Sequence, residues 1–111
     1  MTDQTPTFDT LDVTVSEDGI ATVRLANDPV NAISQAMRHE LADALEILRE
    51  DRVRVVVVTG TPTVFSVGAD VGLFEEAQEW TTAEFRRNSR VLGRVFDGLE
   101  TIEKPVIAAI E

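Results

Sequence analysis

The run Val53–Thr59 constrains the fold of this chain most. Its sequence, VRVVVVT, is almost entirely β-branched and has one charged interruption. A strand of this kind has both faces buried, which is typical of an interior strand in a helix-covered sheet. The stretch that follows, up to Phe74, contains a glycine-bearing turn and then a helix start near Val71. A helix start directs unpaired backbone N–H groups back at the turn, so the sequence predicts a candidate anion-facing loop at the end of this strand.

Two further strands precede this run. Leu11–Val15 and Ile20–Leu25 both alternate apolar and polar residues, and Glu17–Gly19 between them has turn chemistry, so they predict a β-hairpin. Ser34 then offers an N-cap for an amphipathic helix. The apolar positions of that helix recur at helical spacing: Met37, Leu41, Ala44, Leu45 and Leu48.

A second long helix is predicted after Thr81, because Thr81 and Glu84 form a capping box. Its apolar face comprises Phe85, Leu92, Val95, Phe96, Leu99 and Ile102. Lys104 precedes a proline and ends the helix, and Val106–Ile110 is expected to begin another buried strand. The expected order is β-β-α-β-short α-α-β, an α/β arrangement with right-handed crossovers.

Composition limits the size and class of the protein. With 111 residues, 43% of them hydrophobic, the chain can build one domain with a core but not two. We expect residues 1–9 to be a flexible N-terminal end and residues 10–111 to form one unit. Without cysteine there is neither a disulfide framework nor a thiolate site, and neither a signal peptide nor a bilayer-length apolar run is present, so a cytoplasmic location is expected.

The net charge of the chain limits which partners it can bind. A net charge of −10 argues against nucleic acid and anionic membranes as partners, because phosphates would be repelled. Twenty acidic residues stand against a single lysine, Lys104, and the other basic residues are arginines. This pattern fits either a halophilic cytoplasm or a GC-rich genome, and both interpretations remain open. His39 has no nearby cysteine, Asp-x-His pattern or second histidine, so no metal site is predicted.

The turn itself has chemistry suited to an oxyanion. Gly68 accepts backbone angles that a side chain would forbid, so the turn can be tight and a ligand can approach closely. Asp70 suits the N-cap of a short helix that begins near Val71. A thioester carbonyl placed there would meet the N–H of Ala69, and such a donor is worth about 3–4 kcal/mol of barrier. The alternative from these residues alone is a plain strand-to-helix connection.

Three segments in order resemble the crotonase superfamily, the enoyl-CoA hydratase/isomerase proteins. Gly19–Ser34 resembles the opening strand and its Pro-then-Asn-Ala turn, and the short spacing Pro29-Val-Asn31 is most similar to the hydratase part of bifunctional fatty-acid oxidation enzymes. Phe65–Val71 is similar to the family's Phe-Ser-Ala-Gly-Ala-Asp-Ile loop. Lys104–Glu111 resembles the strand that leads into the family's second oxyanion loop.

The resemblance implies a crotonase-like fold of ββα-type units, with a mostly parallel sheet flanked by helices, of which this chain is the N-terminal portion. It implies an acyl-CoA thioester substrate with coenzyme A as part of the substrate, no prosthetic group, and hydration of trans-2-enoyl-CoA. Ala69 is implied as an oxyanion-hole N–H donor. The residues implied in holding coenzyme A are Asn31, Ala32, Val67, Gly68, Ala69, Asp70 and Val71. Val67 replaces the usual alanine and Gly72 replaces a frequent lysine, which leaves the acyl specificity open.

The family's second oxyanion loop and its paired glutamates correspond to positions beyond Glu111. We therefore expect the chain alone to be inactive, since hydration needs a positioned base and acid. Glu75, Glu76 and Glu79 form a polar helical patch, which is typical of a solvated face. The family's trimers, or dimers of trimers, are expected only of full-length members.

Three hypotheses follow from the sequence. The first is the N-terminal part of an enoyl-CoA hydratase or a related enzyme. The second is a non-catalytic acyl-CoA-binding subunit, or one that a complementing chain completes. The third is an unrelated α/β interaction domain in which the loop at Phe65–Val71 is structural.

Overall fold

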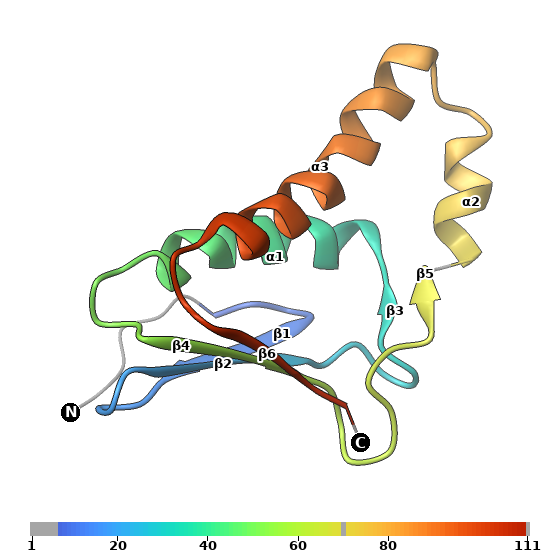
Figure 1. Ribbon diagram of the computed structural model, residues 1–111. Helices are drawn as coiled ribbons and strands as arrows, with labels where there is room; N and C mark the ends of the chain where they lie inside the picture. The colour runs from blue at the N-terminus through green and yellow to red at the C-terminus, as the bar shows by residue number, and fades with distance from the viewer. Residues whose placement is uncertain (1–6, 70, 111) are drawn as a thin grey trace.

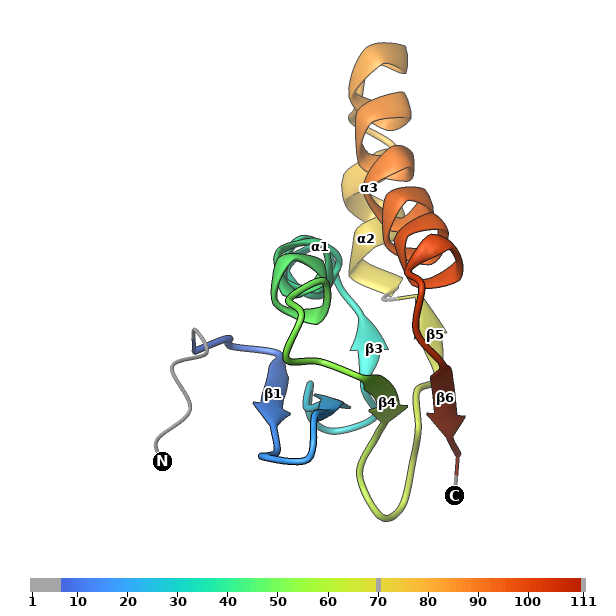
Figure 2. The ribbon, with the colours of Figure 1, turned by 60° about the vertical axis from the view of Figure 1, so that its left-hand side comes forward.

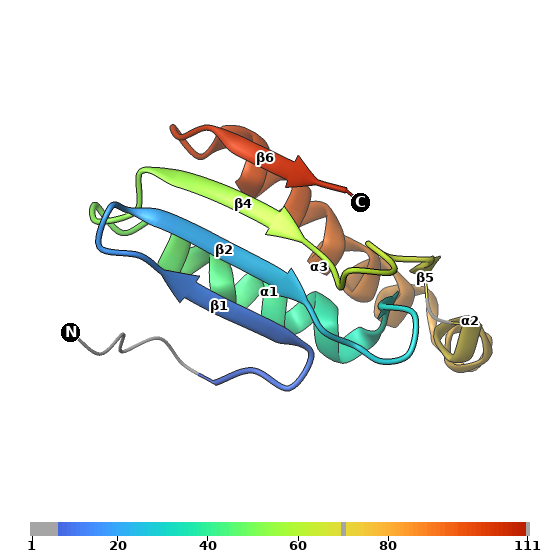
Figure 3. The ribbon, with the colours of Figure 1, turned by 90° about the horizontal axis from the view of Figure 1, so that it is seen from below.

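The computed structural model describes residues 7–69 and 71–110. Four strands form one sheet: β1 (Leu11–Val15), β2 (Ile20–Leu25), β4 (Val55–Thr59) and β6 (Val106–Ala109). Their order is β1-β2-β4-β6, with an antiparallel β1–β2 pair and two parallel pairs after it (Figure 3). The expected hairpin, the interior position of β4 and the mostly parallel sheet are confirmed.

A second, two-stranded ladder lies beside the end of this sheet. It pairs β3 (Ala32–Ile33) with β5 (Gly68–Ala69) in parallel, placing Ala32 opposite Gly68 and Ile33 opposite Ala69. The sequence did not predict either strand, because two-residue strands are too short to carry an alternating pattern. This ladder brings two segments more than 30 residues apart into contact at the candidate loop.

Three helices complete the fold: α1 (Gln35–Leu48), α2 (Val71–Ala77) and α3 (Thr82–Thr101). The helices α1 and α3 lie on the same face of the sheet, and α3 rises away from it towards α2 (Figure 1). Figure 2 shows α1 almost end-on above β1, β2 and β4, with the C-terminal end of α3 above β6. Seen from below, the other face of the sheet is not covered by any helix of the described residues (Figure 3).

Both predicted helix caps are present. The Ser34 hydroxyl accepts a hydrogen bond from the Met37 N–H at 3.2 Å, which satisfies one of the free donors at the start of α1. The Thr81 hydroxyl accepts from the Glu84 N–H at 3.1 Å, as the capping box predicts. The other end of α1 is held by Lys104, whose Nζ donates to the Leu48 carbonyl at 2.7 Å.

The core lies between the sheet and α1. It is built from alternate residues of β1 and β2, from Val56 of β4, and from the apolar face of α1. Its buried members include Leu11, Val13, Ala21, Val23, Leu25, Met37, Ala44, Leu45, Ile47, Leu48, Val53 and Val56.

One expectation about burial is wrong. The strand β6 is the edge of the described sheet, since only β4 pairs with it, and Ile107 is exposed because it points to the opposite face from Val106, which no described helix covers. Of the predicted apolar face of α3 only Val95 is buried, while Phe85 and Phe96 are exposed. Helical spacing identifies which residues share a face but not whether another element covers that face.

Candidate functional site

The candidate loop begins where β4 ends. Gly60 has no room for a side chain there, since a Cβ atom would lie 2.4 Å from the Val64 carbonyl oxygen and 2.6 Å from Phe65 Cα. The turn closes through the Thr61 N–H, which donates to the Val64 carbonyl at 2.9 Å. This tight turn redirects the chain from the end of β4 towards β3.

The far end of the loop is fixed against β3. The Val67 N–H donates to the Val30 carbonyl at 3.2 Å, immediately before the β3–β5 ladder begins. Ladder pairing places the backbone of Ala69 opposite Ile33. The structure therefore brings Asn31 and Ala32 directly beside Val67, Gly68 and Ala69, as their shared assignment to one site requires.

Gly68 is the conformationally special residue of the loop. Its φ angle is +96°, in the region that favours glycine, and no atom lies within 4 Å of the place where a Cβ would be. The backbone at Gly68 is thus bare on the side where a side chain would stand. Val67 beside it is exposed, so a valine in place of the alanine found in the similar family loop adds apolar surface to the outside of the loop and not to the core.

The segment after the loop starts α2 at Val71, as predicted. Asp70, the predicted N-cap and one of the implied coenzyme A contacts, lies outside the described residues.

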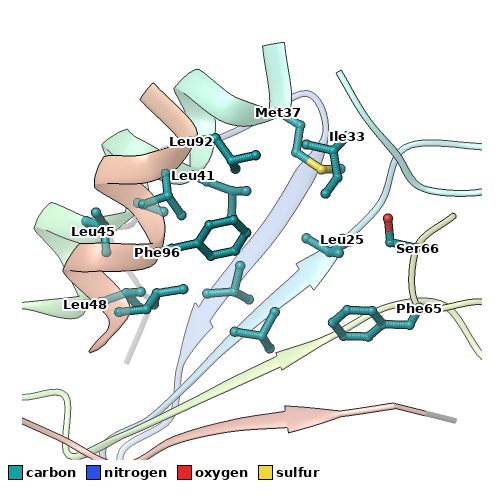
Figure 4. Close-up of a pocket in the computed structure, with 15 residues that line it drawn as sticks. Leu25, Ile33, Met37, Leu41, Leu45, Leu48, Phe65, Ser66, Leu92 and Phe96 are labelled. Carbon is teal, nitrogen blue, oxygen red and sulfur yellow. The ribbon is translucent and has the colours of Figure 1, made fainter. Parts of the chain in front are cut away.

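An apolar cavity of about 180 Å³ lies behind the loop, between the sheet, α1 and α3 (Figure 4). Figure 4 shows Phe65 and Ser66 on one side of it and Leu92 and Phe96 of α3 on another. Its lining comprises Val23, Leu25, Ile33, Met37, Leu41, Ala44, Leu45, Leu48, Val58, Phe65, Ser66, Leu92, Val95, Phe96 and Leu99. The sequence did not predict this cavity, because it exists only where α3 leans away from the sheet.

The charged side chains around the loop differ in their solvation, and the Arg24 guanidinium contacts its start by donating to the Gly60 carbonyl at 2.7 Å. Glu75, Glu76 and Glu79 are exposed, as a solvated face predicts, and so is His39. Arg38 is half-buried, its burial lowers its pKa, and its guanidinium donates a long 3.5 Å bond to the Asn88 carbonyl. Within residues 7–69 and 71–110, no three potential metal ligands come together, and none of the helices there is long and apolar enough to cross a membrane.

What this arrangement offers chemically is a backbone surface. A glycine with positive φ, an adjacent backbone fixed by a ladder, and the start of a helix form a rigid concentration of amide groups with little side chain around it. Such a surface can stabilise developing negative charge on a carbonyl oxygen.

The model of the family described as enoyl-CoA hydratase/isomerase matches residues 15–111. The chain is 35% identical over 103 residues to the glyoxysomal fatty acid beta-oxidation multifunctional protein MFP-a of Brassica napus, covering 92% of this chain and 14% of that protein. It is 34% identical over 93 residues to the peroxisomal bifunctional enzyme of Cavia porcellus, covering 83% of this chain and 12% of that protein.

A solved structure supports the same family assignment. The enoyl-CoA hydratase of Bacillus anthracis superposes with a TM-score of 0.76 at 26% identity, covering 92% of this chain and 40% of that one. The chain thus spans well under half the length of each protein it matches here.

Proposed function

Because the chain belongs to the enoyl-CoA hydratase/isomerase family, we propose that its β5 strand supplies half of an oxyanion hole for the thioester carbonyl of an acyl-CoA. The Ala69 N–H is the donor. The reaction of the whole protein is the hydration of a trans-2-enoyl-CoA, in which the thioester oxygen gains negative charge as water adds to the double bond.

One observation carries this proposal: the β3–β5 ladder fixes the backbone of Ala69 next to the bare, positive-φ backbone of Gly68. A donor that is already fixed needs no reorganisation when charge develops on the substrate, and this is where an oxyanion hole gains its energy. A side chain at residue 68 would stand over this surface. The coenzyme A contact is proposed to be completed by five further residues: Asn31, Ala32, Val67, Asp70 and Val71.

The chain alone is proposed to bind but not to hydrate. Hydration requires a general base for water and an acid for the α-carbon within hydrogen-bond reach of the substrate. Asp70 within the loop is assigned to the coenzyme A contact, and the next acids along the chain, Glu75, Glu76 and Glu79, are all solvated. The second donor and the catalytic carboxylates are therefore proposed to come from outside these 111 residues.

A hydration assay tests this directly. Crotonyl-CoA is incubated with the chain, and loss of the ultraviolet absorbance of the conjugated thioester is followed, with the Glu75→Gln, Glu76→Gln, Glu79→Gln triple variant as the control. We expect the uncatalysed rate for both proteins. Turnover by the chain that disappears in the triple variant would show that these three carboxylates supply the missing acid and base.

A second candidate is a partner-completing subunit, and the uncovered face of the sheet favours it (Figure 3). The edge strand β6 and the exposed Ile107, Phe85 and Phe96 offer apolar surface for a complementing polypeptide. Co-expression with the C-terminal remainder of a family member tests this candidate. Co-purification with restored crotonyl-CoA hydration supports it, and failure of the two polypeptides to associate counts against it. The trimeric assembly and the cytoplasmic location remain predictions.

A further inference from the structure

Asn31 is the most unusual polar residue of the described chain. Its side chain is only 1% exposed, and its φ angle is +55°, in the left-handed region that few residues other than glycine adopt. Asparagine tolerates this region better than most residues because its short side chain can hydrogen-bond locally. A buried amide in a strained backbone persists where the surrounding bonds determine it.

The carboxamide of Asn31 is bonded at both ends. Its Oδ1 accepts from the Asn27 N–H at 2.8 Å, and its Nδ2 donates to the Phe65 carbonyl at 2.9 Å and, more weakly, to the Val64 carbonyl at 3.4 Å. The Asn31 N–H in turn donates to the Asn27 carbonyl at 2.7 Å. The side chain therefore ties the β2–β3 turn to the candidate loop from the inside.

A second link runs from the Asn31 carbonyl through Ser66. The Ser66 hydroxyl donates to the Asn31 carbonyl oxygen at 2.6 Å, and the same hydroxyl oxygen accepts from the Gly68 N–H at 3.1 Å. One hydroxyl thus connects the positive-φ residue of the turn to the positive-φ residue of the loop. Its neighbour Val67 is held separately, by its N–H bond to Val30.

From these contacts we propose that Asn31 and Ser66 are positioning residues that set the orientation of the Gly68–Ala69 backbone. Asn31 fixes where the loop lies, and the Ser66 hydroxyl fixes the Gly68 peptide unit that precedes the Ala69 N–H. The catalytic consequence rests on the function proposed above for Ala69, whereas the mechanical link does not.

This limits any coenzyme A contact of Asn31 to its backbone and assigns its side chain the task of positioning the loop. Each polar atom of its carboxamide already has a protein partner, and the side chain is almost inaccessible. A ligand could reach the turn at the exposed Val30 or through the backbone of Ala32 without touching that carboxamide.

The experiment uses amide hydrogen exchange measured by NMR on the complete chain and on four variants. Ser66→Ala removes the hydroxyl, and Ser66→Thr restores one. Asn31→Gly keeps the positive φ but removes the carboxamide, and Asn31→Asp keeps the acceptor for Asn27 while removing the donor to Phe65. The Val67 amide is the readout, since it donates to the Val30 carbonyl and not to a deleted group; the hairpin amides report global stability.

We expect Ser66→Ala and Asn31→Gly to speed exchange at Val67 by about five-fold relative to the hairpin, the equivalent of one lost hydrogen bond. Ser66→Thr should restore the protection, and Asn31→Asp should be at least as disruptive as Asn31→Gly, because its buried carboxylate oxygen would face the Phe65 carbonyl oxygen. Exchange that accelerates equally at the loop and the hairpin, or only at Gly68, would overturn the proposal, because the residues would then stabilise the fold or one amide without positioning the loop.

A second arm separates this proposal from the proposed function. Crotonyl-CoA is added to each protein, and the Ala69 amide shift is recorded. A wild-type response that falls in Ser66→Ala and returns in Ser66→Thr supports both proposals. Absence of any wild-type response contradicts the role of Ala69 as a donor, while the exchange data still decide whether Asn31 and Ser66 position the loop.

Discussion

Three glycines differ in why glycine is needed at their positions: Gly60 has no space for a side chain, Gly68 has a positive φ angle, and Gly93 has neither constraint. At Gly60, a Cβ would lie within 2.4–2.6 Å of three backbone atoms of Val64 and Phe65. At Gly68 the Cβ would meet nothing, but φ is +96°. Gly93 in α3 has neither constraint, since a Cβ there meets nothing and the residue is helical. Replacement by alanine should therefore have three different effects.

The magnitudes follow from these contacts. Gly60→Ala forces backbone atoms apart and should cost about 3 kcal/mol, the upper end for overpacking. Gly68→Ala adds only backbone strain, about 1–2 kcal/mol. Gly93→Ala should stabilise by about 0.5–1 kcal/mol, because alanine loses less conformational entropy in a helix.

Urea unfolding followed by circular dichroism measures all three free energies of unfolding. With a slope of about 2 kcal/mol per molar urea, Gly60→Ala should lower the midpoint by about 1.5 M and Gly68→Ala by about half as much. The reasoning is refuted if Gly60→Ala matches the wild type, or if Gly68→Ala is as stabilising as Gly93→Ala. Should Gly60→Ala not fold at all, the opposite signs expected for Gly68→Ala and Gly93→Ala still test the distinction.

Three further outcomes are expected. Lys104→Met should lower the free energy of unfolding by about 2 kcal/mol, because the Lys104 Nζ donates to the Leu48 and Glu50 carbonyls at the end of α1. Thermal unfolding measures this effect, and an unchanged melting temperature would contradict it. Thr81→Ala should lower the free energy of unfolding by about 1 kcal/mol, because the Glu84 N–H at the start of α3 loses its acceptor. Urea unfolding measures this loss, and Thr63→Ala, at an exposed threonine of the loop, is the control. Raising NaCl from about 0.1 M to about 1 M shortens the Debye length from about 10 Å to about 3 Å and should raise the melting temperature of a chain with net charge −10; a melting temperature that falls with NaCl would show that self-repulsion does not limit its stability.

Much of the main sheet and of the helix boundaries could be predicted from the sequence, because local signals specify them. Period-two alternation identifies β1 and β2, the β-branched run identifies β4, and hydroxyl caps at Ser34 and Thr81 begin α1 and α3 where predicted. Each of these signals lies within a few residues of the element that it specifies.

The parts that could not be predicted depend on contacts between distant segments. The β3–β5 ladder forms because the Asn31 turn and the Ser66 loop bond to each other across 35 residues. The positive φ of Asn31 carries no sequence signal apart from the tolerance of asparagine for that region. The exposure of Ile107 and Phe96 depends on which elements cover them, and apolar composition alone suggested burial.

The candidate site is intermediate between these cases. The glycine turn and the helix start at Val71 are local features, so the loop was identifiable. What holds the loop in place was not, since the carboxamide of Asn31 and the hydroxyl of Ser66 act through hydrogen bonds to carbonyls far along the chain.

The central claim is that the Ala69 N–H faces the carbonyl oxygen of a bound thioester. NMR on the nitrogen-15-labelled chain tests it with two ligands, crotonyl-CoA and an S-butenyl-CoA thioether of the same length that lacks the carbonyl oxygen. The account predicts a downfield shift of the Ala69 amide proton with the thioester and a much smaller one with the thioether. Equal shifts with both ligands, or an unmoved Ala69 amide, would contradict it.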